Sequence, residues 1–221
     1  MSDPGTTPET PQTPAPTRPK RFSMIRSFTP ADLLTLGNAT CGMASILLCL
    51  NHVAEDLKMV YLWAALGLLP VALVLDAFDG WVARKTRRAS SLGADLDSLA
   101  DIVSFGVAPA VLAFTLGMRG LWDALVLVYF VVCGISRLAR YNVTAADFAD
   151  ESGKVSHFEG TPIPTSLSLV IVLAVAFGTG AVHGELWGGE VVLGPGRLHP
   201  LVLMYAVSGS LMISTIRIPK P

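Results

Sequence analysis

Six long apolar runs, separated by short polar segments, dominate the chain from residue 33 onward. A helix needs about 20 residues to cross the hydrocarbon core of a bilayer, and about 17 is the practical minimum. The second and fourth runs reach that length when their helices continue through the charged residues that follow. The pattern predicts an all-α, polytopic membrane protein with six transmembrane helices, over Leu33–Val53, Met59–Leu75, Leu92–Met118, Leu121–Ser136, Pro162–Val182 and Pro200–Ile216.

The composition indicates that lipid is the solvent of this chain. Hydrophobic residues make up 52% of the 221 residues and charged residues 15%, against roughly 25% in an average soluble domain. Residues 1–17 are rich in Pro and Thr and hold no basic residue, which predicts a disordered tail. Residues 18–30 are basic with apolar side chains between the charges, and predict a juxtamembrane segment on anionic lipid. Residues 31–217 then form one six-helix transmembrane domain.

The basic residues predict the orientation of the helices. When the N-terminus is placed in the cytoplasm, every Lys and Arg except Lys58, Arg119 and Arg197 falls in a cytoplasmic segment. Membrane proteins carry such an excess of positive charge on their cytoplasmic side. We therefore expect a multi-pass integral membrane protein with both termini in the cytoplasm, located in the inner membrane if the cell is bacterial. A Gly-rich loop over 183–198 would lie on the opposite side.

Five aspartates occur where the second and third apolar runs meet the polar segment between them. They are Asp76, Asp79, Asp95, Asp97 and Asp101. At about 1.5 Å per residue, Asp76 lies roughly 26 Å along its helix and Asp101 lies equally far from the other end of the next helix. Both carboxylates should therefore reach the same depth, just below the cytoplasmic headgroups. Ionisable residues inside a membrane helix indicate a functional site.

Four of these aspartates fall on two helix faces that can meet across a pocket. At about 100° per residue, each face spans a limited arc of its helix. The two faces hold Asp76, Asp79, Gly80 and Ala83 on one helix, and Gly93, Asp97, Asp101 and Ser104 on the next. Asp95 falls on the opposite side of its helix and is excluded.

Converging carboxylates in a low-dielectric site cannot all stay ionised without cations. Oxygen ligands select Mg²⁺, Mn²⁺ or Ca²⁺, and two such ions about 3.5–4 Å apart assist substitution at phosphorus. Gly80 and Gly93 let a phosphate or base approach the backbone, and Arg84 is placed to bind a phosphate oxygen. Helix capping would explain one aspartate but not four on two matched faces. A cation pathway is the other alternative, and it would spread carboxylates through the membrane depth.

These residues resemble the signature of the CDP-alcohol phosphotransferase family, D-x2-D-G-x2-A-R-x8-G-x3-D-x3-D, with every position present. The resemblance implies a homodimer of six-helix subunits, each with a binuclear Mg²⁺ or Mn²⁺ site open to the cytoplasm. It implies transfer of a substituted phosphate from a CDP-linked donor to an alcohol, with release of CMP. Residues 31–217 would then be the catalytic domain.

Four further stretches are similar to the phosphatidylserine synthase branch of the family, which uses CDP-diacylglycerol and L-serine. They are Leu33–Gly42, Leu96–Ala110, Ser136–Asn142 and Phe158–Pro164. Alternatives within the family are a glycerol-phosphate or inositol-phosphate acceptor and an ether-linked donor lipid. A cation transporter is the alternative from another class, but the inverted repeats and broken helices typical of transporters are not evident. Membrane lipids are expected partners and nucleic acids are not.

The resemblance assigns roles to the acidic cluster and its surroundings. Asp76, Asp79 and Asp97 would be metal ligands, and Asp101 would be both a ligand of the second metal and the general base for the serine hydroxyl. The CDP pocket would be lined by Gly80, Ala83, Arg84 and Gly93.

Polar residues on two other helices are further candidates. Asn38 could contact cytidine or the metal shell, or could instead make a hydrogen bond between helices. Thr35 and Thr40, on the same helix, are expected to bond to the backbone. At the end of the fourth helix, Arg137 and Arg140 could bind the serine carboxylate or a lipid phosphate, or could only set the orientation. Tyr141 and Asn142 are weaker candidates for the same role.

Overall fold

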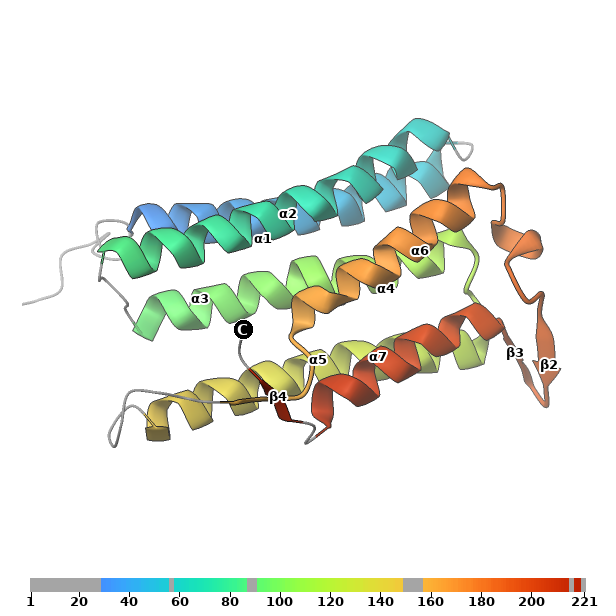
Figure 1. The fold of residues 1–221 in the computed structure, drawn as a ribbon. Helices are drawn as coiled ribbons and strands as arrows, with labels where there is room; N and C mark the ends of the chain where they lie inside the picture. The colour runs from blue at the N-terminus through green and yellow to red at the C-terminus, as the bar shows by residue number, and fades with distance from the viewer. Residues whose placement is uncertain (1–28, 56–57, 87–90, 149–156, 215–216, 220–221) are drawn as a thin grey trace, which may run out of the picture.

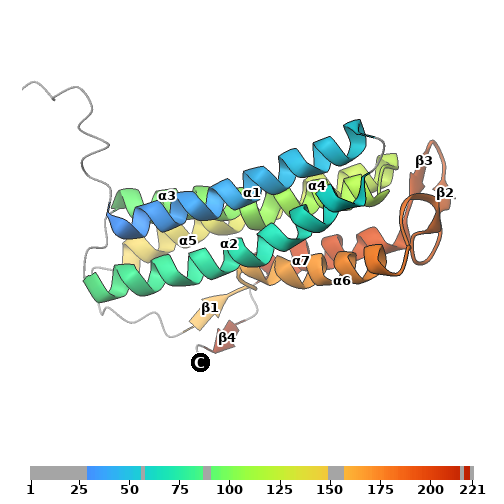
Figure 2. The ribbon, with the colours of Figure 1, turned by 90° about the horizontal axis from the view of Figure 1, so that it is seen from above.

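The structure is a computed structural model that describes residues 29–55, 58–86, 91–148, 157–214 and 217–219. The predicted tail over 1–17, and the basic segment up to residue 28, lie outside the described residues. The described part is an elongated bundle of helices (Figure 1), seen from above in Figure 2. Its N-terminal helices are α1 (Pro30–Ala54) and α2 (Met59–Thr86), followed by α3 (Ser91–Asp101), η2 (Ile102–Val107), α4 (Ala108–Leu116) and α5 (Leu121–Phe148).

Within the described residues, four helical stretches are long and apolar enough to cross a membrane: α1, α2, the continuous run α3–η2–α4, and α5. The α3–η2–α4 run is the central one, since 67% of its most apolar window is buried, against 28–33% for the other three. In Figure 1 it lies between α1 and α2 on one side and α5 and α7 on the other. The sequence predicts that the second and fourth helices continue through the charged residues that follow their apolar runs. This is confirmed, because α2 continues to Thr86 and α5 to Phe148.

The last two helices are shorter than the sequence predicts. A 3₁₀ turn, η3 (Ile163–Ser166), leads into α6 (Leu167–Gly178), and η5 (Pro200–Val202) leads into α7 (Leu203–Ile213). Prolines at the start of both segments favour a tight first turn. After α6 the chain turns at Gly180, whose φ is +77°, a conformation that glycine adopts readily.

Within the part of the chain that the structure describes, two small sheets flank the bundle, and the apolar pattern predicts neither. In the segment expected to be a loop, η4 (His183–Glu185) precedes a hairpin of β2 (Val191–Leu193) and β3 (Gly196–Leu198). On another side, β1 (His157–Glu159) pairs with β4 (Arg217–Pro219), which places the end of the described chain beside the segment that leads into α6. Strands of three residues are too short to give a recognisable alternation.

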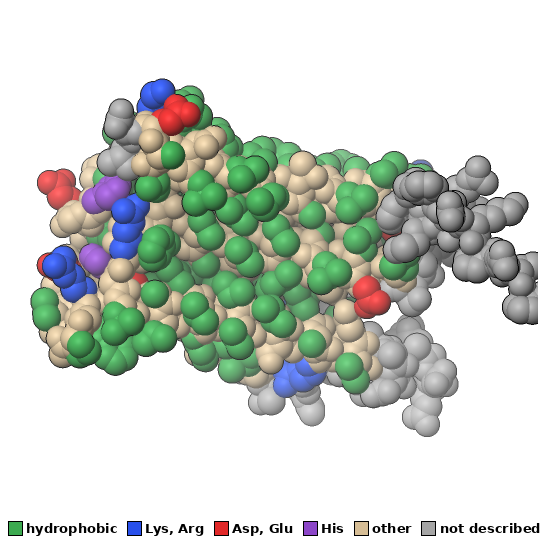
Figure 3. All heavy atoms as spheres, turned by 180° about the vertical axis from the view of Figure 1, so that it is seen from behind, with side chains coloured by type: hydrophobic (Ala, Val, Ile, Leu, Met, Phe, Trp, Pro, Cys, Tyr) green, Lys and Arg blue, Asp and Glu red, His purple; other side chains and the backbone are tan. Residues whose placement is uncertain are grey.

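The surface of the bundle has the character of a lipid-facing surface. Large apolar side chains are exposed along α1, α2 and α5, among them Leu50, Trp63 and Val132. Figure 3 shows hydrophobic side chains spread over one face, with the charged side chains near the two ends. Inside the bundle, by contrast, several polar side chains are buried, including Thr35, Asn38 and Ser45 of α1.

Close packing of α1 against η2 positions this polar interior. A Cβ added at Gly42 would lie 2.7 Å from the Cα of Ser104, so only glycine fits there. The short approach lets Ser104 Oγ donate a hydrogen bond of 2.8 Å to the backbone oxygen of Asn38. The π-helical turn η2 begins directly after Asp101, and such turns occur often at functional sites.

The variant Gly42→Ala should therefore be destabilised by about 1–3 kcal/mol, because the added methyl group overpacks the contact with η2. Gly67→Ala is the matched control, since a Cβ at Gly67 meets nothing within 4 Å and alanine favours a helix by up to about 1 kcal/mol. Thermal unfolding in detergent measures both effects. A Gly42→Ala protein that is as stable as the wild type would contradict this account of the packing.

Candidate metal centre

Three carboxylates meet inside the bundle. Asp76 comes from α2, and Asp97 and Asp101 come from α3. One oxygen of each lies within 4.8 Å of the others. Asp76 lies about 15 Å along the helix axis from the end of α2. Asp101 lies equally far, about 15 Å, from the start of α3. The two helices thus bring their acidic residues to one level, as the apolar pattern predicts.

The two acidic helices are connected through α1. Helix α1 packs along both α2 and α3, whereas α2 and α3 make few backbone contacts with each other. The carboxylates therefore face one another with the polar side of α1 beside them. Buried residues of α1 recur every three or four positions and form a single stripe: Asp32, Thr35, Asn38, Gly42, Ser45, Cys49 and His52.

The cluster contains polar atoms that the protein itself leaves unpaired. Among the described residues, Oδ1 of Asp97, Oδ1 of Asn38 and Nε of Arg137 are buried and have no hydrogen-bond partner. Buried polar atoms are normally satisfied, so these atoms point to a bound ligand. An unpaired carboxylate oxygen beside two further carboxylates fits a divalent cation with oxygen ligands.

Asp79, one turn after Asp76, is buried and differs in its contacts. Its Oδ2 accepts a hydrogen bond of 2.7 Å from Thr35 Oγ1. The same hydroxyl lies 3.1 Å from the backbone oxygen of Ala31, which is the backbone bond that the sequence predicts. The sequence does not predict the second contact, with Asp79. Asp79 stays within electrostatic range of Asp97. The structure therefore joins three of the four predicted aspartates closely and places the fourth beside them.

Asn38 makes a hydrogen bond between helices and also lies at the acidic cluster, so both roles considered for it from the sequence are compatible with its position. Its Nδ2 donates a hydrogen bond of 3.2 Å to Oδ1 of Asp101, which is a bond between helices. The same bond brings the amide into the acidic cluster and orients the carboxylate of Asp101. Thr40, in contrast, is exposed and donates to the backbone oxygen of Leu36 at 2.7 Å, as expected.

The remaining signature residues surround the last turns of α2 and the start of α3. The nearest atom to a Cβ added at Gly80 is Nη1 of Arg84, at 3.5 Å, so the exposed guanidinium lies over the glycine. Ala83 and Gly93 are half-buried. Asp95 is exposed, in agreement with its predicted position on the far side of the helix.

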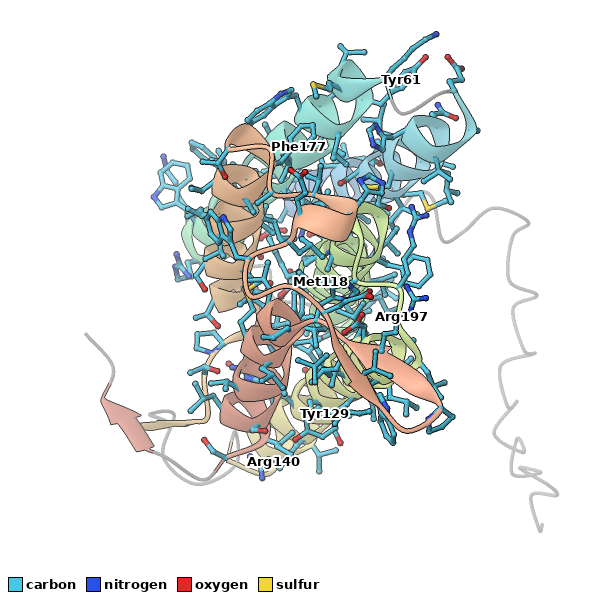
Figure 4. All side chains as sticks on the ribbon, turned by 90° about the vertical axis from the view of Figure 1, so that its right-hand side faces the viewer. Tyr61, Met118, Tyr129, Arg140, Phe177 and Arg197 are labelled. Carbon is cyan, nitrogen blue, oxygen red and sulfur yellow. The ribbon has the colours of Figure 1, made fainter. Side chains whose placement is uncertain are left out.

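The arginines of α5 lie at different distances from the cluster. Arg137 is half-buried and interacts electrostatically with Asp101. Arg140 and Tyr141 are exposed, and Arg140 lies at the outer edge of the bundle in Figure 4. Asn142 donates a hydrogen bond of 3.1 Å from Nδ2 to Ser98 Oγ, which connects α5 to α3.

Sequence reasoning missed the contact between Thr35 and Asp79. The signal that could have revealed it is the polar stripe on α1, because polar residues at helical spacing inside an apolar helix face the interior of a membrane bundle. The partner of Thr35 lies on another helix, and periodicity along one helix does not identify it.

Comparison with known proteins gives one family. Residues 28–209 match the family model described as CDP-alcohol phosphatidyltransferase. The CDP-diacylglycerol–serine O-phosphatidyltransferase of Saccharomyces cerevisiae is 40% identical over 207 residues, which cover 90% of this chain and 74% of the relative. The archaetidylserine synthase of Methanothermobacter thermautotrophicus is 35% identical, over 86% of this chain and 69% of its own length.

A bacterial relative is similar to this chain to a comparable degree. The CDP-diacylglycerol–serine O-phosphatidyltransferase of Bacillus subtilis is 34% identical over 150 residues, which cover 66% of this chain and 75% of the relative. The family match extends from the residue before Thr29 through most of α7 and includes every aspartate of the cluster. The chain therefore belongs to the CDP-alcohol phosphatidyltransferase family.

Proposed function

We propose that this protein transfers the phosphatidyl group of CDP-diacylglycerol to the hydroxyl of L-serine, releasing CMP, in phospholipid biosynthesis. The observation that carries the proposal is the convergence of the Asp76, Asp97 and Asp101 carboxylates. An all-oxygen site of this kind suits divalent cations that assist substitution at phosphorus. Two of the relatives described above are named for this transfer from CDP-diacylglycerol to serine, which supports the choice of donor and acceptor.

Two Mg²⁺ or Mn²⁺ ions are the proposed cofactors. Asp76, Asp97 and Asp101 would hold them, with Asp79 as the fourth ligand. Bound ions would polarise the phosphate under attack and neutralise charge on the departing CMP. The unpaired, buried Oδ1 of Asp97 supports this role, because a metal would satisfy it. The hydrogen bond from Thr35 would fix the carboxylate of Asp79 for the same purpose.

Asp101 is also the proposed general base. A serine hydroxyl is a weak nucleophile near neutral pH, and a carboxylate that accepts its proton can accelerate the reaction by about 10²–10⁴-fold. The amide of Asn38 holds one oxygen of Asp101 and so orients the group. As the serine oxygen bonds to phosphorus, the bond from phosphorus to the CMP oxygen breaks, and no covalent enzyme intermediate is needed.

The donor and acceptor sites are assigned around this centre. Gly80, Ala83, Gly93 and Arg84 would line the CDP pocket, together with Asn38. The guanidinium of Arg84, which lies 3.5 Å from a Cβ added at Gly80, supports a phosphate at this position.

Arg137 is the proposed partner of the serine carboxylate or of a donor phosphate. Its electrostatic interaction with Asp101 places a cation next to the proposed base, and its unpaired Nε is a donor for an anionic ligand. The exposed Arg140 and Tyr141 would contact lipid headgroups nearby, and Asn142 would hold α5 against α3 through Ser98.

The proposed topology has six spans, with both termini and the active site on the cytoplasmic side. The shorter α6 and α7, with their 3₁₀ turns, would complete the six. Arg84 and Lys85 lie in the last turn of α2, beyond Asp76 and Asp79, and Arg137 lies within electrostatic range of Asp101. This positive charge near the aspartates supports a cytoplasmic position. The exposed apolar surface would contact lipid and, in part, a second subunit of a homodimer.

A second candidate differs only in the donor lipid. The similarity to an archaetidylserine synthase favours a version in which an ether-linked lipid replaces the diacylglycerol. The aspartate cluster would act in the same way on either donor, because the reacting phosphate is identical.

The assignment of the acceptor is tested by CMP release from detergent-solubilised protein with CDP-diacylglycerol and Mn²⁺. We expect CMP to appear when L-serine is added, and not with glycerol 3-phosphate or inositol phosphate. Release with one of those acceptors alone would show that serine is the wrong acceptor. The absence of CMP with every alcohol would overturn the proposed reaction.

The variant Asp97→Asn should lose at least about 100-fold in turnover, because the amide removes a charged ligand from the proposed metal site, while the protein stays folded by circular dichroism. Asp95→Asn is the matched control two residues away, and it should keep most of the activity because Asp95 is exposed. Equal losses in both variants would refute the assignment of Asp97.

Thr35→Val should weaken Mn²⁺ binding by roughly 10–100-fold, since a hydrogen bond to a charged group contributes about 1.5–3 kcal/mol. Thr40→Val makes the same change where the hydroxyl bonds only to the backbone of its own helix, and it should bind Mn²⁺ like the wild type. Electron paramagnetic resonance of free Mn²⁺ measures both affinities. If Thr35→Val binds as tightly as Thr40→Val, Thr35 does not position Asp79 for the metal.

A further inference from the structure

The end of the bundle opposite the aspartates holds a second polar site. Along η2 and α4, Gly117 lies roughly 24 Å from Asp101. A cavity of about 450 Å³ opens there, and its lining includes Arg119, His183, Gly184, Glu190, Arg197 and His199. Figure 4 looks onto this end, with Arg197 labelled, and Figure 3 shows histidine and basic side chains gathered there.

Most of the charged or titratable side chains in the lining are basic. Arg119 and Arg197 contribute two permanent positive charges, and two histidines lie beside them. The carboxylate in the lining is Glu190, which is exposed and lies 3.3 Å from Nη1 of Arg197. An exposed ion pair of this kind is weak, so an incoming anion can compete with Glu190 for the guanidinium.

Arg119 is held in place at the end of α4. Its Nε donates to the backbone oxygen of Phe114 at 3.1 Å, and its Nη2 donates to that of Thr115 at 3.3 Å. A guanidinium has five N–H donors, so these two bonds leave others for a ligand. The side chain is thereby ordered before any ligand binds, which lowers the entropy lost on binding.

His199 is oriented by a fully buried carboxylate. Asp123 accepts bonds from Nδ1 of His199 at 2.6 Å, from the backbone nitrogen of His199 at 2.8 Å and from that of Gly120 at 2.9 Å. A carboxylate at Nδ1 fixes the ring and leaves Nε2 as the nitrogen available to a ligand in the cavity. This arrangement has no role in the reaction proposed above, because it lies at the other end of the bundle.

His183 adds a strained residue to the same wall. Its φ is +54°, which is uncommon outside glycine and is often found at functional sites. Burial, and then the positive charge of Arg119, lower the pKa of His183. The effect of Arg119 on His183 indicates a positive electrostatic potential in the cavity, which would attract an anion.

We propose that this cavity binds a phosphate oxyanion at the membrane surface opposite the catalytic centre. The guanidinium groups of Arg119 and Arg197, which both line the cavity, suit phosphate oxygens. Trp122 and Trp187 are 37% and 41% exposed near the cavity-bearing loops, and tryptophan is enriched where a membrane meets water. The ligand could be the headgroup of an anionic phospholipid or a soluble phosphate, which share this chemistry.

The first test separates these two sources. Native mass spectrometry of the full-length protein in detergent measures binding of phosphatidylglycerol, and calorimetry measures binding of inorganic phosphate. We expect the double variant Arg119→Gln/Arg197→Gln to bind the phosphate-bearing probe at least about tenfold more weakly than the wild type. Phosphatidylglycerol binding that inorganic phosphate does not displace identifies a lipid ligand. Displacement by inorganic phosphate identifies a soluble one.

The second test leaves the charges unchanged. A Cβ added at Gly184 meets nothing within 4 Å and Gly184 lines the cavity, so Gly184→Leu adds an apolar side chain to the lining and should also lose binding. Gly67→Leu is the control, because Gly67 is equally unobstructed and lies on the exposed side of α2. Thermal unfolding reports that each variant is folded, independently of catalysis. If the wild type binds neither probe, or if both cavity variants bind like the control, the proposal is wrong.

Discussion

Electrostatic repulsion between carboxylates in a low-dielectric interior is the constraint on which the rest of this structure depends. Asp76, Asp97 and Asp101 bring their oxygens within 4.8 Å of one another, and such a group stays ionised only with cations beside it. The protein supplies Arg137 within electrostatic range of Asp101. It leaves an oxygen of Asp97 unpaired. Both features are explained if divalent ions complete the site.

Helix α1 supports this charged centre although it contributes no aspartate to it. Thr35 and Asn38 bond to Asp79 and Asp101, and Ser104 bonds back to the backbone of α1. The glycine at position 42 permits the close approach that these bonds require. In a bundle whose outer surface faces lipid, hydrophobic burial holds the helices together only weakly. Polar contacts and tight packing at small residues therefore carry more of the positioning.

The sequence predicted the parts of the site that depend on a single helix. Periodicity places Asp97 and Asp101 on one face and turns Asp95 outward, and helical rise puts Asp76 and Asp101 at one depth. Contacts between helices far apart in the chain were not predictable in this way, as the bond of Thr35 to Asp79 and that of His199 to Asp123 demonstrate. The π-helical turn after Asp101 also escaped prediction, because a single extra residue in a turn barely changes an apolar pattern.

The central claim is that the aspartates of α2 and α3 jointly hold divalent ions, and anomalous diffraction from crystals grown with Mn²⁺ tests it most directly. The account predicts anomalous peaks at coordination distance, about 2.1 Å, from carboxylate oxygens of Asp76, Asp97 and Asp101. A map with no anomalous peak among these carboxylates at saturating Mn²⁺ would contradict it.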